Sequence, residues 1–68
     1  MFTFKETDED GIKHFVSEDG EFEVLQQEND GFFLLYRFNE KENFFDWTET
    51  KHTSLEECEV ETKSLLAS

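Results

Sequence analysis

The stretch DGIKHFVSEDGEFEVLQQENDG, residues 10–31, contains all three glycines of the chain, and each of them follows an aspartate. Asp-Gly is a strong signal for a two-residue hairpin turn, because such a turn needs positive φ angles that glycine and aspartate tolerate. Gly11, Gly20 and Gly31 lie nine and eleven residues apart, which leaves room for ordinary strands between them. The stretch therefore predicts an antiparallel β-meander. The flanking acids leave open that one glycine belongs to a longer loop instead.

We expect five strands, at residues 2–7, 12–17, 21–27, 32–38 and, after a polar loop at 39–43, residues 44–51. Apolar and polar residues alternate in most of them, as in Phe2 and Phe4 against Thr3 and Lys5, which is typical of strands with one buried face. The fourth strand differs, because residues 32–36 are apolar on both faces. This pattern indicates either a central strand covered on both sides or a strand that meets a partner.

The C-terminal segment is predicted to be a helix that begins with a capping box. Ser54 is the expected N-cap, with Glu57 reaching back to its amide, and the pair Thr53 and Glu56 would serve one residue earlier. Val60 falls on the polar side of this helix. The apolar stripe that should pack on the sheet comprises Leu55, Cys58, Thr62, Leu65 and Leu66.

These elements predict an α+β fold, an antiparallel β-meander of four to five strands followed by one C-terminal α-helix packed on the sheet. A chain of 68 residues cannot divide its apolar residues between two cores, so residues 1–68 are expected to form one acidic domain. The single cysteine cannot form an internal disulfide, and nine phenylalanines with one tryptophan and one tyrosine must supply a thin core. A homodimer that hides part of this aromatic surface is an alternative.

Charge is the most unusual property of the composition. Eighteen acidic residues oppose six basic ones, for a formal net charge of -12. Direct contact with nucleic-acid phosphates or with an anionic membrane requires basic residues, so both classes of partner are disfavoured. Solubility alone needs a net charge of only about 2–8 in a small domain. The excess therefore indicates a second role for the acids.

Catalysis and metal binding are not indicated. His14 and His52 belong to no recognisable nucleophile arrangement, and Cys58 lies on the apolar stripe of the helix, so neither an enzyme nor a cofactor is expected. The acidic turns at residues 8–10 and 18–19 offer oxygens for weak Ca²⁺ or Mg²⁺ binding but lack the spacing of an EF-hand loop. We interpret them as solvated turns, with no metal site.

Nothing in the sequence has the pattern of a signal peptide or a transmembrane segment, and a lone cysteine is typical of a reducing compartment. The expected location is the cytoplasm, which would be the host cytoplasm for a phage-encoded protein.

The carboxylates suggest a binding function. Residues on the same face of a strand lie about 6.6–6.8 Å apart, which is comparable to the spacing of phosphates along a nucleic-acid strand. In size and charge the chain resembles the small inhibitors that phages and mobile elements encode against nucleases, such as anti-restriction and anti-CRISPR proteins. The hypothesis is a nucleic-acid mimic that blocks a basic surface on a larger host protein. Its predicted contacts are Glu21, Glu23, Glu40, Glu42, Asp46 and Glu49, with aromatic anchors Phe33 and Tyr36.

Two other functions remain open at this point. The first is an adaptor that binds a partner protein through its apolar strand at residues 32–36, with charge serving solubility only. The second is a weak module for divalent ions or small ligands.

Overall fold

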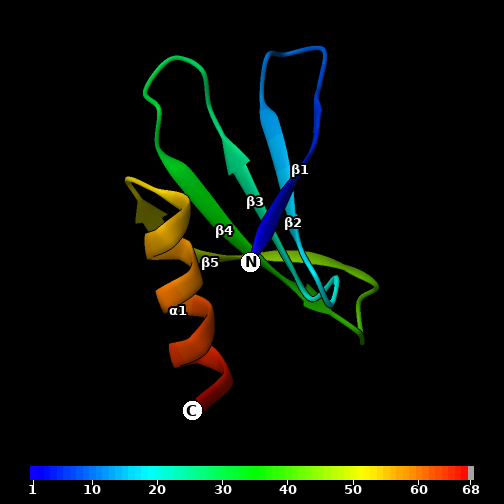
Figure 1. The fold of residues 1–68 in the computed structure, drawn as a ribbon. Coiled ribbons are helices and arrows are strands. Elements are labelled where there is room, and N and C mark those ends of the chain that lie inside the picture. Colours follow the sequence, from blue (N-terminus) through cyan, green and yellow to red (C-terminus); the bar gives the residue numbers. More distant parts are fainter. Residues whose placement is uncertain (68) are drawn as a thin grey trace.

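The computed structural model describes residues 1–67, and its strands follow one another across a single sheet (Figure 1). All neighbouring strands are antiparallel, in the order β1-β2-β3-β4-β5, and the helix α1 packs against one face. The α+β meander is confirmed, with five strands whose predicted bounds lie within one residue of those observed. The elements are β1 (Phe2–Thr7), β2 (Lys13–Ser17), β3 (Phe22–Gln26), β4 (Phe33–Asn39), β5 (Phe44–His52) and α1 (Leu55–Ala67).

The three Asp-Gly pairs lie at strand connections, as predicted, but these connections are longer than two residues. β1 ends at residue 7 and β2 begins at 13, and the next two gaps span residues 18–21 and 27–32. Aspartate side chains organise them: Asp19 Oδ1 accepts from the Glu21 amide at 3.0 Å, and Asp30 Oδ1 accepts from the Phe32 amide at 3.0 Å. Because the carboxylate bonds the amide two residues on, it forms a side-chain turn that a tight two-residue hairpin has no room for.

The buried core lies between the sheet and the helix. It consists of Phe22 and Val24 from β3, Leu35 from β4 and Cys58 from α1, each no more than 2% exposed. Register explains why they meet, because Val24 and Leu35 are cross-strand partners and therefore share a face. Partly buried side chains surround this core: Phe2, Phe15, Phe33, Leu55 and Leu65.

The helix begins as the capping box predicts, with one difference. Ser54 Oγ accepts from the Glu57 amide at 3.2 Å, which confirms Ser54 as the N-cap. The Glu57 carboxylate, however, bonds the amide and the hydroxyl of Thr53, at 2.9 and 2.7 Å, and not the amide of Ser54. The predicted stripe is correct for Leu55, Cys58 and Leu65, all of which contact or join the core.

The predicted apolar stripe is wrong at its C-terminal end, because Leu66 is 53% exposed. Helix α1 ends at Ala67, so the last leucine extends past the side chains that make up the core. Thr62 uses its hydroxyl within the helix, where it donates to the Glu59 carbonyl at 2.7 Å. Val60 is 68% exposed, as its place on the polar side predicts.

The fold depends on glycine in its turns, and Gly20 tests this most cleanly. Its φ is 75°, and an added Cβ would meet no atom within 4 Å, so only backbone strain opposes substitution. We expect Gly20→Ala to lower the free energy of unfolding by about 1–2 kcal/mol, and Gly20→Asn by less, since asparagine tolerates the left-handed region. Urea unfolding measures both, and an alanine variant as stable as the wild type would contradict the turn geometry.

Candidate functional site

One face of the sheet is covered by α1, and no helix or strand within residues 1–67 packs on the other. Cross-strand pairing links Val16 to Glu23, Glu23 to Tyr36 and Tyr36 to Trp47, so these four residues form one row. Because neighbours along a strand point to opposite faces, this row projects away from the helix. A second row on the same face runs through His14, Leu25, Leu34 and Lys51. We call this surface the open face.

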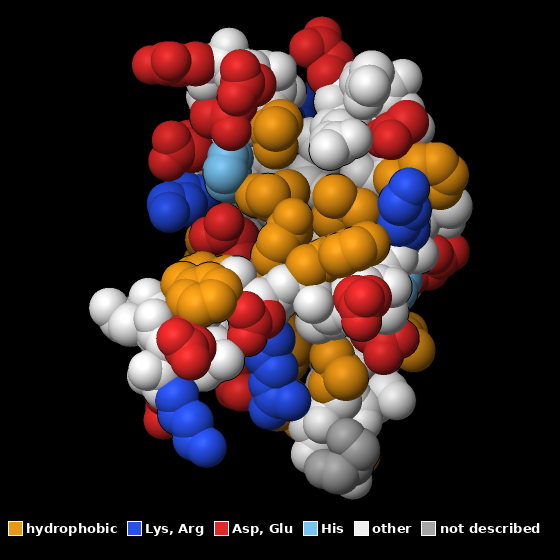
Figure 2. Space-filling view, turned by 180° about the vertical axis from the view of Figure 1, so that it is seen from behind, with side chains coloured by type: hydrophobic (Ala, Val, Ile, Leu, Met, Phe, Trp, Pro, Cys, Tyr) orange, Lys and Arg blue, Asp and Glu red, His pale blue; other side chains and the backbone are white. Residues whose placement is uncertain are grey.

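The open face has an apolar middle. Figure 2 shows hydrophobic side chains gathered there, with acidic side chains around them. Trp47 is 44% exposed and Phe32 39% exposed, with Lys51 Nζ lying 5.6 Å from the centre of the Phe32 ring. Phe38 and Phe45 pack edge to face, with ring centres 5.3 Å apart. A contiguous apolar surface with a polar border is typical of a protein-interaction site.

An open groove lies at the β4–β5 hairpin and has a volume of about 870 Å³. Phe38 and Trp47 in its lining belong to the open face, whereas Arg37 and Asp46 pair with each other, and Arg37 pairs with the core residue Phe22. These two charged side chains therefore lie on the face that α1 covers. Four acids and two bases supply its charge, so its lining is net acidic. The charged lining residues are Asp19, Glu21, Glu40, Asp46, Arg37 and Lys41.

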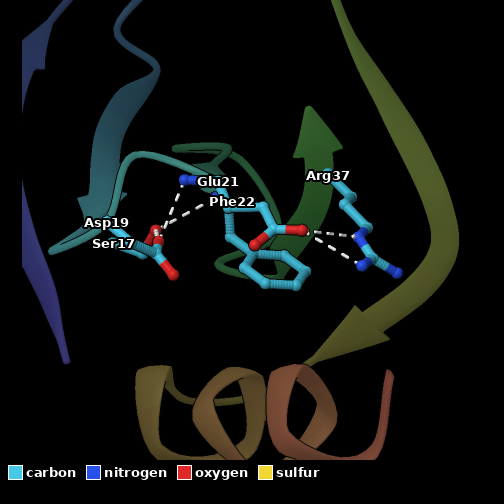
Figure 3. Close-up of polar contacts among 5 residues, drawn as sticks. All are labelled: Ser17, Asp19, Glu21, Phe22 and Arg37. Carbon is cyan, nitrogen blue, oxygen red and sulfur yellow. Dashed lines mark hydrogen bonds and ion pairs between the residues drawn. The ribbon is translucent and has the colours of Figure 1, made fainter. Parts of the chain in front are cut away.

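One wall of the groove is held by an ion pair. Arg37 Nε and Nη2 donate to Glu21 Oε1 at 3.2 and 3.0 Å, and the guanidinium lies 5.6 Å from the centre of the Phe22 ring (Figure 3). Ser17 Oγ donates to Asp19 Oδ1 at 2.7 Å and accepts from the Phe22 amide at 3.0 Å. These bonds fix the turn that carries Asp19 and Glu21 directly next to a core residue.

The same contacts stabilise the ionised form of the Asp19 side chain. The hydroxyl of Ser17, followed by the amide of Glu21, holds the pKa of this carboxyl below its usual 3.8. Hydrogen bonds to the charged form have this effect because they stabilise the anion. Asp19 therefore contributes a full negative charge at neutral pH.

A second set of bonds in the groove lining is built around Asn39, next to Asp46, the cross-strand partner of Arg37. Its Nδ2 donates to Asp46 Oδ2 at 2.8 Å, and its Oδ1 accepts from the amides of Lys41 and Glu42 at 3.0 and 3.2 Å. Asn43 completes the turn with a φ of 58°. The side chains at residues 40–42 are exposed on this turn, which explains how Glu40 reaches the groove.

The structure brings together some of the predicted contact residues and separates others. Glu21, Glu40 and Asp46 line the groove. Glu23 lies on the open face, with Oε1 3.5 Å from Nδ1 of His14. The expected row of free carboxylates through Glu21 and Glu23 is not formed, because Glu21 precedes β3 and is held by Arg37.

Glu42 and Glu49 lie outside the groove lining. Glu42 is exposed in the turn between β4 and β5, and Glu49 is exposed in β5 with a φ of 65°. Glu49 lies in a bulge between the register pairs Leu34–Lys51 and Tyr36–Trp47, and this bulge interrupts the regular spacing of side chains. Evenly spaced charge along this strand is therefore not present.

The two predicted aromatic anchors lie on opposite faces of β4. Tyr36 is on the open face, as the cross-strand partner of Trp47. Phe33 packs against the core, and its ring centre lies 6.1 Å from that of Phe15. Phe33 therefore supports the covered face, whereas Tyr36 belongs to the candidate site.

Sequence reasoning missed Trp47, Phe38 and Asp19 as members of the site. A signal for Trp47 was present, because a single helix can cover only one face of a sheet. The apolar residues of the other face must then stay uncovered. Assigning them to that face requires the register, which the alternation pattern alone does not supply.

The other reactive groups do not converge on a chemical site. Among residues 1–67, no three histidine, cysteine or acidic side chains are arranged to hold a metal ion. Cys58 is buried, and this burial raises the pKa of its thiol to about 12. Such a thiol is protonated at neutral pH and unreactive.

No membrane-spanning helix and no similarity to a known protein helps to identify the site. No helix within residues 1–67 combines the length and apolar character needed to cross a bilayer. No protein-family model, no curated protein and no solved structure matches this chain.

Adjacent leucines in β4 test the division into a covered and an open face. Leu35 is fully buried beneath α1, while Leu34 is half-buried on the open face. We expect Leu35→Ala to lower the free energy of unfolding by about 2–5 kcal/mol, or to abolish folding, and Leu34→Ala to cost less than half as much. Urea unfolding followed by circular dichroism measures both. Equal losses would show that both faces are core.

Proposed function

We propose that this chain is a small acidic inhibitory protein that binds a larger protein and blocks a basic surface used for nucleic acid. One observation carries the proposal: the β4–β5 hairpin carries an acidic groove and also the open-face aromatic residues Phe38 and Trp47. A single hairpin therefore offers both carboxylates and aromatic rings to a partner that contacts both of its faces. We further propose that the protein acts by occlusion, without a catalytic step.

The groove suits a cationic guest. Asp19, Glu40 and Asp46 present carboxylates around a space wide enough for side chains of a partner. Arginine and lysine, which bind phosphates in nucleic-acid grooves, are also the natural partners of carboxylates. The net charge of -12 adds a long-range field that speeds association with a basic surface.

The aromatic side chains of the open face support the same proposal. Surfaces that bind single-stranded nucleic acid combine a basic groove with platforms on which bases stack. Trp47 and Tyr36 are cross-strand neighbours on the open face and could fill the space that bases otherwise occupy. Aromatic residues are also frequent hot spots in protein interfaces.

The class of inhibitor that this proposal fits is the phage or mobile-element type, represented by anti-CRISPR and anti-restriction proteins. The small size and strong acidity of the chain support it. We expect the protein to act in the cytoplasm, where an unpaired cysteine such as Cys58 remains reduced.

A second candidate is an adaptor that binds through the apolar face alone. The half-buried Leu34 and Tyr36 and the exposed Trp47 favour it, since they lie together on the uncovered side of β4 and β5. In that case the acids would serve solubility. The two candidates differ in how binding depends on salt.

The partner and the role of charge can be tested together. The protein is immobilised, incubated with bacterial lysate at low salt, and eluted with a salt gradient, after which the eluted partner is purified. We expect its Kd to rise at least about tenfold between 0.05 and 0.5 M salt, because screening weakens exposed charge pairs. Added protein should also displace nucleic acid from the partner. A salt-independent Kd would favour the adaptor, and undiminished nucleic-acid binding would contradict inhibition by occlusion.

Charge variants locate the contact. Glu40→Lys together with Asp46→Asn removes negative charge from the groove, and the asparagine keeps an oxygen for the bond from Asn39. We expect Kd for the purified partner to rise at least about tenfold, since rim and groove charges steer association. Glu56→Lys together with Glu61→Gln on α1 makes the same three-unit change in net charge and is the matched control, which should change Kd much less. Equal effects at both places would mean that only net charge matters.

A further inference from the structure

His14 is held between two carboxylates, one on each ring nitrogen. Nε2 lies 2.8 Å from Asp8 Oδ2, and Nδ1 lies 3.5 Å from Glu23 Oε1. The imidazole is 20% exposed, so water reaches it only partly. Glu6, its cross-strand partner in β1, is a further acid beside it, and Lys13 precedes it in β2.

Both carboxylates receive a hydrogen bond from His14 only when its imidazole ring is protonated. Neutral imidazole has one N–H, so it can donate to one carboxylate and turns a lone pair toward the other. Imidazolium donates from both nitrogens. Because the contact to Asp8 is the shorter, we expect the remaining proton of the neutral ring to stay on Nε2, with the lone pair of Nδ1 facing Glu23.

The two carboxylates connect His14 to different parts of the candidate site. Asp8 organises the β1–β2 turn, since its Oδ1 accepts from the amides of Asp10 and Ile12 at 2.9 and 3.0 Å. Glu23 lies in the middle of the open face, between its cross-strand partners Val16 and Tyr36. The ring thus ties a turn to the centre of the proposed binding surface.

We propose that Asp8, His14 and Glu23 form a proton-controlled latch that sets the charge of the open face, an inference that rests on the proposed function. With His14 protonated, the latch is closed and the imidazolium offsets the charge of Glu23. Loss of the proton opens the contact to Glu23 and leaves the face one unit more negative. A basic partner then binds more tightly above the pKa of His14 than below it.

The electrostatics agree with this geometry. The Asp8 carboxylate, as the larger cause, and the Glu23 carboxylate raise the pKa of His14 above its ordinary 6.5, against an opposing effect of burial. His14 in turn is the main cause that lowers the pKa of Asp8. A raised histidine pKa stabilises the fold fully below about 6.5, the unfolded value, and this stabilisation is lost as pH rises through the folded value.

NMR titration of the free protein tests the latch directly. We expect the His14 ring resonances of the wild type to titrate with a midpoint above 6.5, and the amides of residues 10–12 to shift with the same midpoint. Asp8→Asn and Glu23→Gln should each lower that midpoint, Asp8→Asn by more. Asparagine keeps an oxygen for the turn amides, so the turn should persist. His52, in β5, contacts neither residue, because its partners are Thr50 and Glu57.

A titration midpoint of His14 at or below 6.5, or one that neither substitution moves, would overturn the latch.

The effect of the latch on binding is measured with a deca-arginine peptide at low salt as the basic probe. From pH 6 to 8.5 the wild type should gain about two- to fivefold more affinity than His14→Gln, the effect of one charge near contact distance in water. His52→Gln is the control and should behave as the wild type.

Equal gains in affinity for the wild type and for His14→Gln would overturn the regulatory role of the latch. The NMR result would still support its geometry. Neither outcome depends on the lysate-derived partner or its salt dependence. Failure of the latch is therefore distinguishable from failure of the proposed function.

Discussion

The structure depends on one constraint, which is that a 13-residue helix can cover only one face of a five-stranded sheet. Fully buried apolar side chains exist only where α1 meets the sheet, at Phe22, Val24, Leu35 and Cys58, among the residues that the structure describes. The helix cap at Ser54 and the Arg37–Glu21 pair over Phe22 lie directly around this contact. Without the helix, the sheet would expose apolar residues on both faces.

The same constraint creates the candidate site. Side chains that would be core in a domain with a second layer, such as Leu34, Tyr36 and Trp47, stay partly exposed instead. An uncovered apolar face favours self-association, and a high net charge opposes it. Under the proposed function, the charge of -12 has two compatible roles, which are to keep copies apart and to attract a partner of opposite charge. The carboxylates of the groove would serve the second role on the same hairpin that carries Trp47.

Local signals were enough to predict the strands, the helix and their order. Each Asp-Gly pair marked a connection and Ser54 marked the helix start, because both depend on interactions within a few residues. The site depended on contacts far apart in sequence. Glu21 meets Arg37 sixteen residues away, and the bulge at Glu49 breaks the alternation that the prediction of the site assumed. Which face of β4 the helix covers was not predictable either, since both faces of residues 32–36 are apolar.

In the proposed complex, the partner contacts the open face and the acidic β4–β5 hairpin, while the exposed side of α1 stays free. Amide hydrogen exchange, compared between the free protein and its complex with the purified partner, tests this arrangement most directly. We expect new protection in β4, in β5 and in the turn at residues 40–43, with exchange in α1 unchanged. Protection confined to α1, with β4 and β5 exchanging as in the free protein, would contradict it.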